Sequence, residues 1–313
     1  MRVLVTGSAG RIGRWQVEAL QNAGYDVRTL DRMAQGKEKT SMEVEHLPGD
    51  LRDINTVRRA VQGMDAVLHL GALSSDRAGP AEDVLTVNVQ GTWNVLMACV
   101  EVGVERMVYF SSVNALGCVG GHRPAAYLPI DDAYPRHPMS PYQLSKHLSE
   151  EACRSFTNKH GLVTVCLRPV FVSAPDTYTR WREPRRQGPS EWQKVEYWAY
   201  VDVRDVCAAG LLSLTAKNIT HDAFLLTADD TTQETPSAEL VDYNYPDTPW
   251  KTALPEGDSA LVSPQADRAA YLAVRDAYFA GHPFRSLMDC SHAKQVLGWQ
   301  PRHSWRDDVN TEA

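Results

Sequence analysis

The chain has 313 residues, of which 43% are apolar and 23% charged, and its formal net charge is −7. This length suffices for one large domain or for two that share a core, and the composition is too apolar for extensive disorder. The negative charge balance gives no electrostatic basis for binding nucleic acid or an anionic membrane. We therefore expect a soluble globular protein with neither a nucleic-acid nor a membrane partner.

The sequence gives no sign of export or of disulfide bonding. Its first residues run directly into a glycine-rich loop at Gly7, which leaves no room for a signal peptide, and no later apolar stretch approaches a membrane span. The six cysteines are scattered and include no Cys-x-x-Cys pair. A reduced cysteine within an apolar pattern acts as a small hydrophobic residue. We expect a cytoplasmic protein without structural disulfides or a bound metal.

Short apolar runs alternate with amphipathic helical stretches over the first half of the chain, the pattern of a parallel α/β sheet. The runs are continuously apolar, as is typical of strands that helices cover on both faces. The expected strands are 2–6, 26–30, 44–47, 66–70, 106–111 and 163–168, and the expected helices are 12–23, 54–62, 82–102 and 141–160. The sequence thus predicts a Rossmann-type, doubly wound parallel sheet.

The alternation breaks between residues 171 and 199, where prolines, arginines and tryptophans are concentrated. A further strand–helix unit follows over 200–214, then a strand at 223–227, and a helical run lies near 263–279. We predict that residues 1–170 and 200–227 form the Rossmann domain. Residues 171–199 and 228–313 would form a smaller, C-terminal substrate-binding lobe.

The glycine-rich loop, Gly7-Ser8-Ala9-Gly10-Arg11-Ile12-Gly13, joins the first predicted strand to the first predicted helix. A tight turn needs an unhindered backbone, and a pyrophosphate needs close approach to backbone N–H groups at a helix N-terminus. The Gly-x-x-Gly-x-x-Gly spacing differs from the general Gly-x-Gly-x-x-Gly fingerprint, so an ordinary glycine turn is an alternative. The position between strand and helix favours dinucleotide binding.

Asp31 ends the second predicted strand. A carboxylate there can accept hydrogen bonds from both ribose hydroxyls and repels a 2′-phosphate, so the sequence favours NAD over NADP as the cofactor of the Rossmann domain. Arg32 and Arg11 weaken this inference, because either guanidinium could pair with a phosphate. A solvated acid at a strand end is the alternative interpretation.

Tyr142 and Lys146 stand four residues apart, on one face of the predicted helix 141–160. Ser111 and Ser112 end a predicted strand, at the sheet edge where open α/β folds bind ligands. Tyrosine normally titrates near pH ~10. A neighbouring ammonium and a positive nicotinamide ring would lower this pKa and let the phenolate take a proton from a substrate hydroxyl, which the serine would also hold. A surface tyrosine beside a lysine is the alternative.

Taken together, these features resemble the extended short-chain dehydrogenase/reductase family, also called NAD-dependent epimerase/dehydratases. The resemblance covers nearly the whole chain, and its motifs are jointly highly specific. Further matching segments are Gly49-Asp50-Leu51-Arg52-Asp53, His69-Leu70-Gly71-Ala72, Asn88-Val89-Gln90-Gly91-Thr92, Leu167-Arg168-Pro169, Tyr200-Val201-Asp202-Val203-Arg204-Asp205-Val206 and Leu297-Gly298-Trp299-Gln300-Pro301.

The resemblance implies roles for individual residues. The expected cofactor contacts are the glycine loop with Arg11 and Ile12, Asp31 at the ribose with Arg32 beside it, Asp50 and Leu51 beside the adenine, Leu70, Gly71 and Ala72 along the cofactor, Lys146 at the nicotinamide ribose, and Tyr142, Pro169 and Val170. Asn88 would support the site, or would be a purely structural amide. The expected substrate contacts are Ser74, Ser112, Asn114 and Tyr142. The implied catalytic residues are Ser112, Tyr142 and Lys146, with Ser112 preferred to Ser111 from its spacing to Gly117. The family pairs helices equivalent to 82–102 and 141–160 in a homodimer.

The chain departs from the pattern of members that act on nucleotide sugars. Those members usually follow Arg-Pro with Asn-x-Tyr-Gly-Pro, whose asparagine helps to hold the diphosphate, but this chain reads Val170-Phe171-Val172-Ser173-Ala174-Pro175. They also tend to carry an arginine where Trp198 stands. The arginines between 180 and 186 could substitute, or could form a solvated face. Dehydratases place an acidic pair after the serine, whereas Val113-Asn114 follows Ser112 here, which disfavours dehydration.

Three functions remain open. The first is an NAD-dependent oxidoreductase that transfers hydride between the cofactor and a secondary alcohol or carbonyl of a sugar or sugar acid, with Tyr142 as acid/base. The second is a nucleotide-sugar 4-epimerase that retains its NAD. The third is a non-catalytic NAD(H)-sensing protein, against which Ser112, Tyr142 and Lys146 argue. The missing diphosphate contacts favour the first.

Overall fold

The computed structural model describes residues 1–33, 44–182, 191–253 and 259–307. Seven strands form one parallel sheet in the order β3-β2-β1-β4-β5-β6-β9. Their bounds are β1 Arg2–Thr6, β2 Asp26–Asp31, β3 Glu45–Pro48, β4 Ala66–His69, β5 Arg106–Phe110, β6 Val163–Pro169 and β9 His221–Leu226. The predicted Rossmann-type parallel sheet is confirmed.

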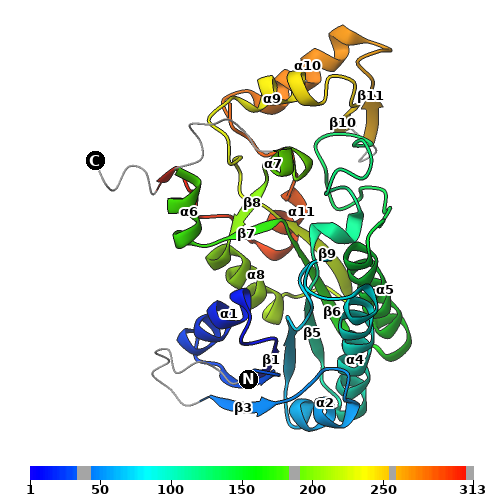
Figure 1. The fold of residues 1–313 in the computed structure, drawn as a ribbon, viewed down its shortest axis with the longest axis vertical. Coiled ribbons are helices and arrows are strands. Elements are labelled where there is room, and N and C mark those ends of the chain that lie inside the picture. The colour runs from blue at the N-terminus through cyan, green and yellow to red at the C-terminus, as the bar shows by residue number, and fades with distance from the viewer. Residues whose placement is uncertain (34–43, 183–190, 254–258, 308–313) are drawn as a thin grey trace.

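Helices cover both faces of this sheet (Figure 1). Helices α1 (Arg11–Asn22) and α8 (Val203–Thr215) pack together on one face, and α2 (Ile54–Val61), α4 (Gly91–Val102) and α5 (Pro141–His160) pack on the other. This double cover explains the continuously apolar strands, since every residue of β4 is buried. Helix α5 has its predicted bounds because Ser140 caps it, Pro141 occupies its first turn and Gly161 ends it with φ 73°.

The predicted helix 82–102 is helical throughout, over residues 81–102, but a π-helical turn interrupts its α-helical geometry. It consists of α3 (Ala81–Leu85), a π-helical turn over Thr86–Gln90 and α4. The π turn carries Asn88, whose side-chain amide bonds the backbone of Leu73 and the hydroxyl of Ser145. Helical periodicity does not reveal such a turn, which is typically found where a helix is shaped by a functional site.

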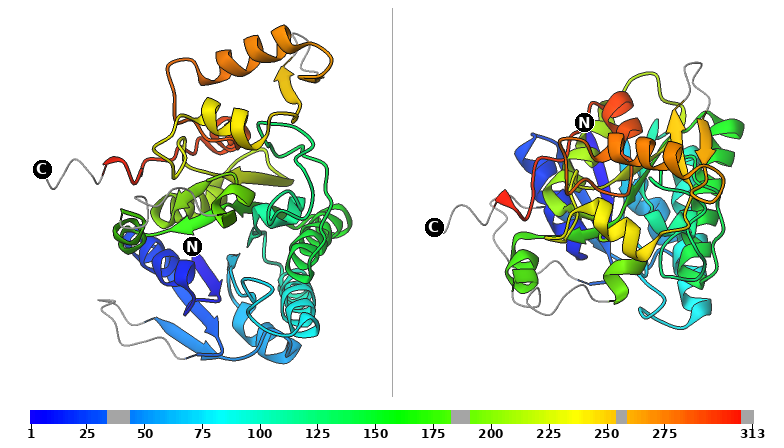
Figure 2. Two further views of the ribbon diagram at one scale, coloured as in Figure 1. Left: turned by 45° about the horizontal axis from the view of Figure 1, so that its top comes forward. Right: turned by 90° about the horizontal axis from the view of Figure 1, so that it is seen from above.

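The remaining elements form a second layer over one end of the sheet (Figures 1 and 2). They are β7 (Phe171–Ser173), α6 (Pro175–Arg182), α7 (Glu191–Val195), β8 (Tyr200–Asp202), α9 (Ser237–Asn244), β10 (Trp250–Ala253), β11 (Ser259–Val262), α10 (Arg268–Phe279) and α11 (Ser291–Leu297). Strand β8 pairs with β7 outside the central sheet, and α11 packs on β9. The loop after β5 also joins this layer, because Leu128 and Ile130 donate backbone hydrogen bonds to Pro249 and Leu287. The domain boundaries drawn from the sequence stay a prediction.

All six cysteines are free and buried. Within the described ranges, no group of acidic, histidine or cysteine side chains is arranged to hold a metal ion. Within the same ranges, the helices lack the combination of length and apolarity that crossing a bilayer would need.

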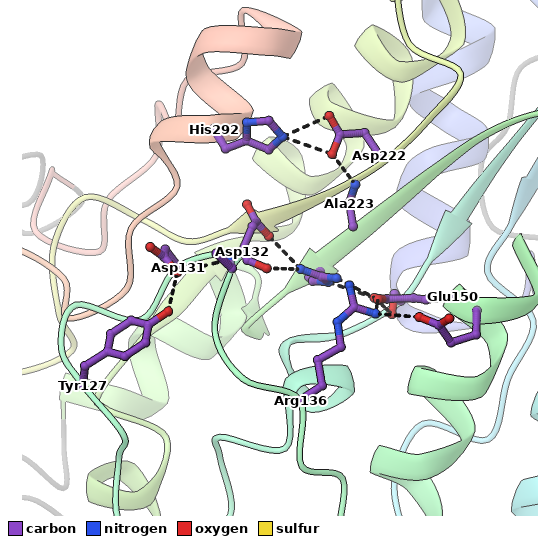
Figure 3. A network of polar contacts seen from close by, with 12 residues as sticks. Tyr127, Asp131, Asp132, Arg136, Glu150, Asp222, Ala223 and His292 are labelled. Atoms are coloured by element: carbon purple, nitrogen blue, oxygen red, sulfur yellow. Dashed lines mark hydrogen bonds and ion pairs between the residues drawn. The ribbon is translucent and has the colours of Figure 1, made fainter. Parts of the chain in front are cut away.

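A buried ion pair fastens α5 to the sheet. The guanidinium of Arg168, on β6, donates to both carboxylate oxygens of Glu150 at 2.9 and 2.8 Å, and the two side chains are 1% and 2% exposed. Arg136 contacts the same carboxylate at 3.2 Å, and Asp132 continues the network (Figure 3). Burial alone would raise the pKa of Glu150, but the bonds from Arg168 outweigh it and hold this pKa below its usual value.

We expect Glu150→Gln to lower the free energy of unfolding by about 3 kcal/mol at neutral pH, because removing one partner leaves a buried charge without full compensation. Urea denaturation measures this change. Glu151→Gln is the matched control, since Glu151 pairs at the surface with Arg136 and Arg154 and its loss should cost at most about 1 kcal/mol. Equal effects of the two substitutions would contradict the prediction.

Candidate active site

A cavity of about 990 Å³ opens at the carboxyl ends of the central strands and collects nearly all the residues predicted from the sequence. Those that line it are Gly7, Gly10, Arg11, Ile12, Gly13, Asp31, Arg32, Asp50, Leu51, Leu70, Gly71, Ala72, Ser74, Ser112, Asn114, Tyr142, Lys146, Pro169 and Val170. Asn88 does not line the cavity. It acts from behind the lining, where its amide oxygen accepts from the Leu73 N–H at 2.7 Å and its amide nitrogen donates to Ser145 at 2.9 Å.

The glycine loop has no space for side chains at its first and last glycines. Gly7 has φ +71°, and a Cβ atom there would lie 2.6 Å from the backbone of Gly71. A Cβ atom on Gly13 would lie 2.2 Å from the carbonyl oxygen of Gly7. Gly10 caps α1 without a side-chain hydrogen bond, and the first turn of this helix lines the cavity. The loop therefore offers the close backbone approach that a pyrophosphate requires.

The carboxylate of Asp31 holds the loop as well as facing the cavity. Its oxygens accept from the backbone N–H groups of Ala9 and Met33, each at 3.0 Å. Asp50, which also lines the cavity, is paired with Arg52 at 2.7 Å, which lowers the pKa of the Asp50 carboxyl. The guanidinium of Arg11 donates to the Val172 carbonyl at 3.2 Å and so ties the loop to β7.

Ser112, Tyr142 and Lys146 meet at the opposite end of the cavity from Asp31. The Ser112 hydroxyl accepts from the backbone and side chain of Asn114, both at 3.2 Å. The ammonium of Lys146 donates to the Phe110 carbonyl at 2.7 Å and lies 5.9 Å from the centre of the Tyr142 ring. Ser111, although it also lines the cavity, donates its hydroxyl to Glu150 at 2.7 Å. This arrangement supports the choice of Ser112.

Burial changes the pKa values of both ionisable groups at this end. It lowers the pKa of Lys146 to about 8, against a smaller upward effect of Glu150. It raises the pKa of Tyr142 to about 12; a hydrogen bond with Ser112 acts in the opposite direction and the charge of Asp76 adds to the rise. From the sequence, Lys146 is expected to help lower the pKa of Tyr142. The protein groups instead give a net increase, because desolvation of the phenolate is the larger effect.

The cavity also contains residues that sequence reasoning missed. Among them are Ser75, Asp76, Arg77, Phe171, Val172 and Glu196. Asp76 accepts from the backbone N–H of Tyr142 at 2.8 Å and thereby fixes the start of α5. Adjacency to Ala72 and Ser74 could have indicated 75–77, but no sequence signal marks Glu196. The side chains of the Arg180–Arg186 cluster lie outside the described residues.

Residues 3–224 match the family model described as "NAD dependent epimerase/dehydratase family". The chain belongs to this family. The resemblance seen in the motifs is thereby confirmed, and with it NAD as the cofactor. The cavity agrees with this cofactor. Its glycine loop leaves no room for side chains at Gly7 and Gly13, and the N-terminus of α1 lines it, which together allow the close backbone approach that the pyrophosphate of a dinucleotide needs.

Curated relatives cover different chemistries within the family. The chain is 32% identical to a uronate dehydrogenase of Pseudomonas syringae pv. tomato over 57% of this chain and 62% of that protein. It is 31% identical to a putative UDP-glucose 4-epimerase of Methanocaldococcus jannaschii over 53% of this chain and 54% of that protein. The matched region thus spans little more than half of either relative.

Solved structures show the same fold over the whole chain. A UDP-glucose 4-epimerase from Thermotoga maritima, solved with UDP-glucose, superposes with a TM-score of 0.67 at 21% identity and covers 100% of both chains. A glucuronic acid dehydrogenase from Chromohalobacter salexigens gives 0.66 at 21% identity over 100% of this chain and 89% of that chain. At this identity the likeness establishes the fold.

Because the pKa of Lys146 falls from 10.5 to about 8, burying its charge costs about 3 kcal/mol. Its bond to Phe110 offsets part of this cost, so Lys146→Met should raise the free energy of unfolding by about 2 kcal/mol at neutral pH. The folded state binds this proton more weakly than the unfolded state. Wild-type stability should therefore rise between about pH 8 and pH 10.5 relative to the variant. Denaturation at several pH values, with the exposed Lys159→Met as control, measures this; a variant less stable than wild type at pH 7 would refute it.

Proposed function

We propose that this protein is an NAD-dependent oxidoreductase that transfers hydride between the cofactor and a secondary alcohol or carbonyl of a sugar or sugar acid. The observation that carries the proposal is the meeting of Ser112, Tyr142 and Lys146 in one cavity with the glycine loop. The family and the similarity to a uronate dehydrogenase support the same class of reaction.

The cofactor is held along the cavity from Asp31 to Lys146. The glycine loop and the N-terminus of α1 would bind the pyrophosphate, Asp31 would bind the adenosine ribose, and Asp50 and Leu51 would flank the adenine. Lys146 would bind the nicotinamide ribose. The chemistry that NAD would supply when bound is hydride acceptance, and the positive charge of its oxidised nicotinamide ring would oppose the effect of burial on the pKa of Tyr142.

The chain's own residues handle the proton. The hydroxyl of Ser112 donates to the substrate oxygen and fixes it beside Tyr142. In the oxidation direction the Tyr142 phenolate takes the proton from that oxygen as the carbon–oxygen double bond forms, and in reduction it returns the proton. Asn114, which already donates to Ser112, orients the serine hydroxyl toward the substrate.

A retained-NAD epimerase acting on a nucleotide sugar is the second candidate, supported by the similarity to a putative UDP-glucose 4-epimerase. Trp198, at the position of the family's diphosphate-binding arginine, is 1% exposed and packs in the core instead of lining the cavity. This favours the dehydrogenase. Purified protein given NAD and a panel of sugars and sugar acids should produce NADH. Epimerised UDP-glucose without release of NADH would establish the second candidate instead.

A homodimer through α4 and α5 is the proposed assembly. Trp93, Leu144 and Leu148 are 50%, 37% and 39% exposed on these two helices. Such an apolar face is typical of a protein–protein contact. Leu148→Glu should therefore convert a dimer to a monomer in light scattering, because it places a charge in the interface. Leu261→Glu, at an exposed leucine of β11, should leave the mass unchanged; a wild-type monomer would rule out the assembly.

Asp31 should control the choice between NAD and NADP. Asp31→Asn removes the charge that repels a 2′-phosphate but retains an oxygen for the backbone of Ala9. It should narrow the difference in binding free energy between the two cofactors by roughly 1–3 kcal/mol. Titration calorimetry of both cofactors tests this. Asp26→Asn, at the exposed opposite end of β2, is the control, and an unchanged preference in Asp31→Asn would count against the assignment.

Tyr142→Phe should lower kcat at least ~100-fold while NAD still binds, because it removes the hydroxyl that moves the proton and keeps the ring. Stopped-flow measurement of NADH formation, combined with calorimetric NAD binding, separates the two effects. Tyr243→Phe is the control, since Tyr243 is 87% exposed and lies outside the cavity. If Tyr142→Phe retained most of its turnover, the proton would have to be moved by another group.

A further inference from the structure

Glu196 is a carboxylate in the wall of the cavity that no motif assigns. It follows α7 directly and lines the cavity together with Ser112, Asn114 and Tyr142. The next two residues, Tyr197 and Trp198, both have left-handed backbones, with φ of 56° and 52°. Large side chains rarely adopt this conformation, and such outliers cluster at ligand sites. The unusual turn therefore fixes the place of Glu196.

The turn is held against the part of the chain that carries the proposed serine and asparagine. The backbone N–H of Gly120 donates to the Val195 carbonyl at 3.1 Å, and the Tyr197 hydroxyl donates to the Cys118 carbonyl at 3.0 Å. Cys118 and Gly120 lie just after the short helix Val113–Leu116, which begins at Ser112 and contains Asn114. The ring of Tyr245 stacks on Tyr197, with centroids 5.3 Å apart. These contacts hold Glu196 in a rigid setting near the substrate end of the cavity.

The carboxylate of Glu196 has no cationic partner among the residues that the structure describes. The groups that face it are the thiol of Cys118, the phenols of Tyr197 and Tyr245 and the backbone amide of Gly120. Burial raises the pKa of Glu196 to about 7, and the Gly120 amide limits the rise. The carboxylate is partly exposed to the cavity, and among the described residues the Gly120 amide is the donor it receives, so its remaining acceptor sites lack protein donors at a desolvation cost. A ligand that supplies hydroxyl donors would remove this cost.

We propose that Glu196 selects the substrate by accepting hydrogen bonds from hydroxyl groups of an uncharged sugar and by repelling a sugar acid that brings its carboxylate to this position. The inference rests on the proposed function and narrows it, because a sugar and a sugar acid are then no longer equivalent substrates. Asp76, the second acid of this end, is already engaged by the backbone of Tyr142. Each of the two carboxylates thus accepts one backbone hydrogen bond, and Glu196 is the one that the second layer brings to this end of the cavity.

The test compares matched pairs that differ only at the terminal carbon, galactose with galacturonate and glucose with glucuronate. For wild type we expect kcat/KM to be at least ~10-fold higher for the neutral member, the scale of a hydrogen bond to a charged group. Glu196→Gln should lower kcat/KM for the neutral sugar, raise it for the acid and leave the KM for NAD unchanged. Glu239→Gln, an exposed acid on α9, should behave as wild type.

The pH dependence gives a signature that a merely structural role would not produce. Because burial raises the pKa of Glu196 to about 7, its protonated fraction should grow as the pH falls through this value while the uronates remain ionised, so repulsion of the acid should weaken. The ratio of kcat/KM for the acid to that for the neutral sugar should rise toward low pH in wild type and stay flat in Glu196→Gln. Taking the ratio cancels the titration of Tyr142 and Lys146, which both substrates share.

The outcomes separate the two proposals. If wild type oxidises both members of a pair equally, or prefers the acid, and Glu196→Gln does not change the ratio, the role of Glu196 is refuted while the oxidoreductase stands. If wild type reduces no NAD with any sugar, the proposed function fails. In that case the change in Tm of the NAD-loaded protein on adding each member of a sugar pair tests the role of Glu196. Stronger stabilisation by the neutral sugar, lost in Glu196→Gln, supports its role, and stabilisation by the acid or by neither sugar overturns it.

Discussion

The position of α5 depends on one buried contact, the pairing of Glu150 with Arg168. Tyr142, Lys146 and Glu150 follow one another at four-residue intervals, so they share a face of this helix. Fixing Glu150 to β6 therefore sets the rotation of the helix and, with it, the approach of the tyrosine and lysine to the cavity. The same carboxylate accepts a hydrogen bond from the hydroxyl of Ser111. The two adjacent serines therefore differ in role, because Ser111 anchors the helix whereas the hydroxyl of Ser112 is left for the cavity.

The cavity is lined by two parts of the fold, the central sheet and the second layer. Its cofactor end is built from turns that directly follow central strands, where backbone geometry dictates glycine. Its other end is bounded by the second layer, through β7 and Glu196, which precedes the turn at Tyr197 and Trp198. Within one family, the first end is thus constrained by a common cofactor, whereas the second is free to vary with the substrate. The diverse activities of the curated relatives are consistent with this division.

Features that depend on local sequence were predictable. The glycine loop, the bounds of α5 and the spacing of Tyr142 and Lys146 follow from steric demands, capping residues and helical periodicity within a few residues. The π turn around Asn88 was not predictable, because contacts with Leu73 and with Ser145 on α5 set it. Glu196 enters the cavity only because distant segments near Cys118 and Tyr245 hold its turn. The rise in the pKa of Tyr142 reflects burial, which residue spacing alone does not measure.

The burial of every cysteine has a chemical consequence for the native protein. Burial raises the pKa of the thiols of Cys99, Cys118, Cys207 and Cys290, so thiolates, the reactive form, are scarce at neutral pH. An alkylating reagent can reach these sulfurs only when the surrounding layers separate. The rate at which the protein loses free thiols to such a reagent is then a measure of how often the native structure opens, obtained without any added label.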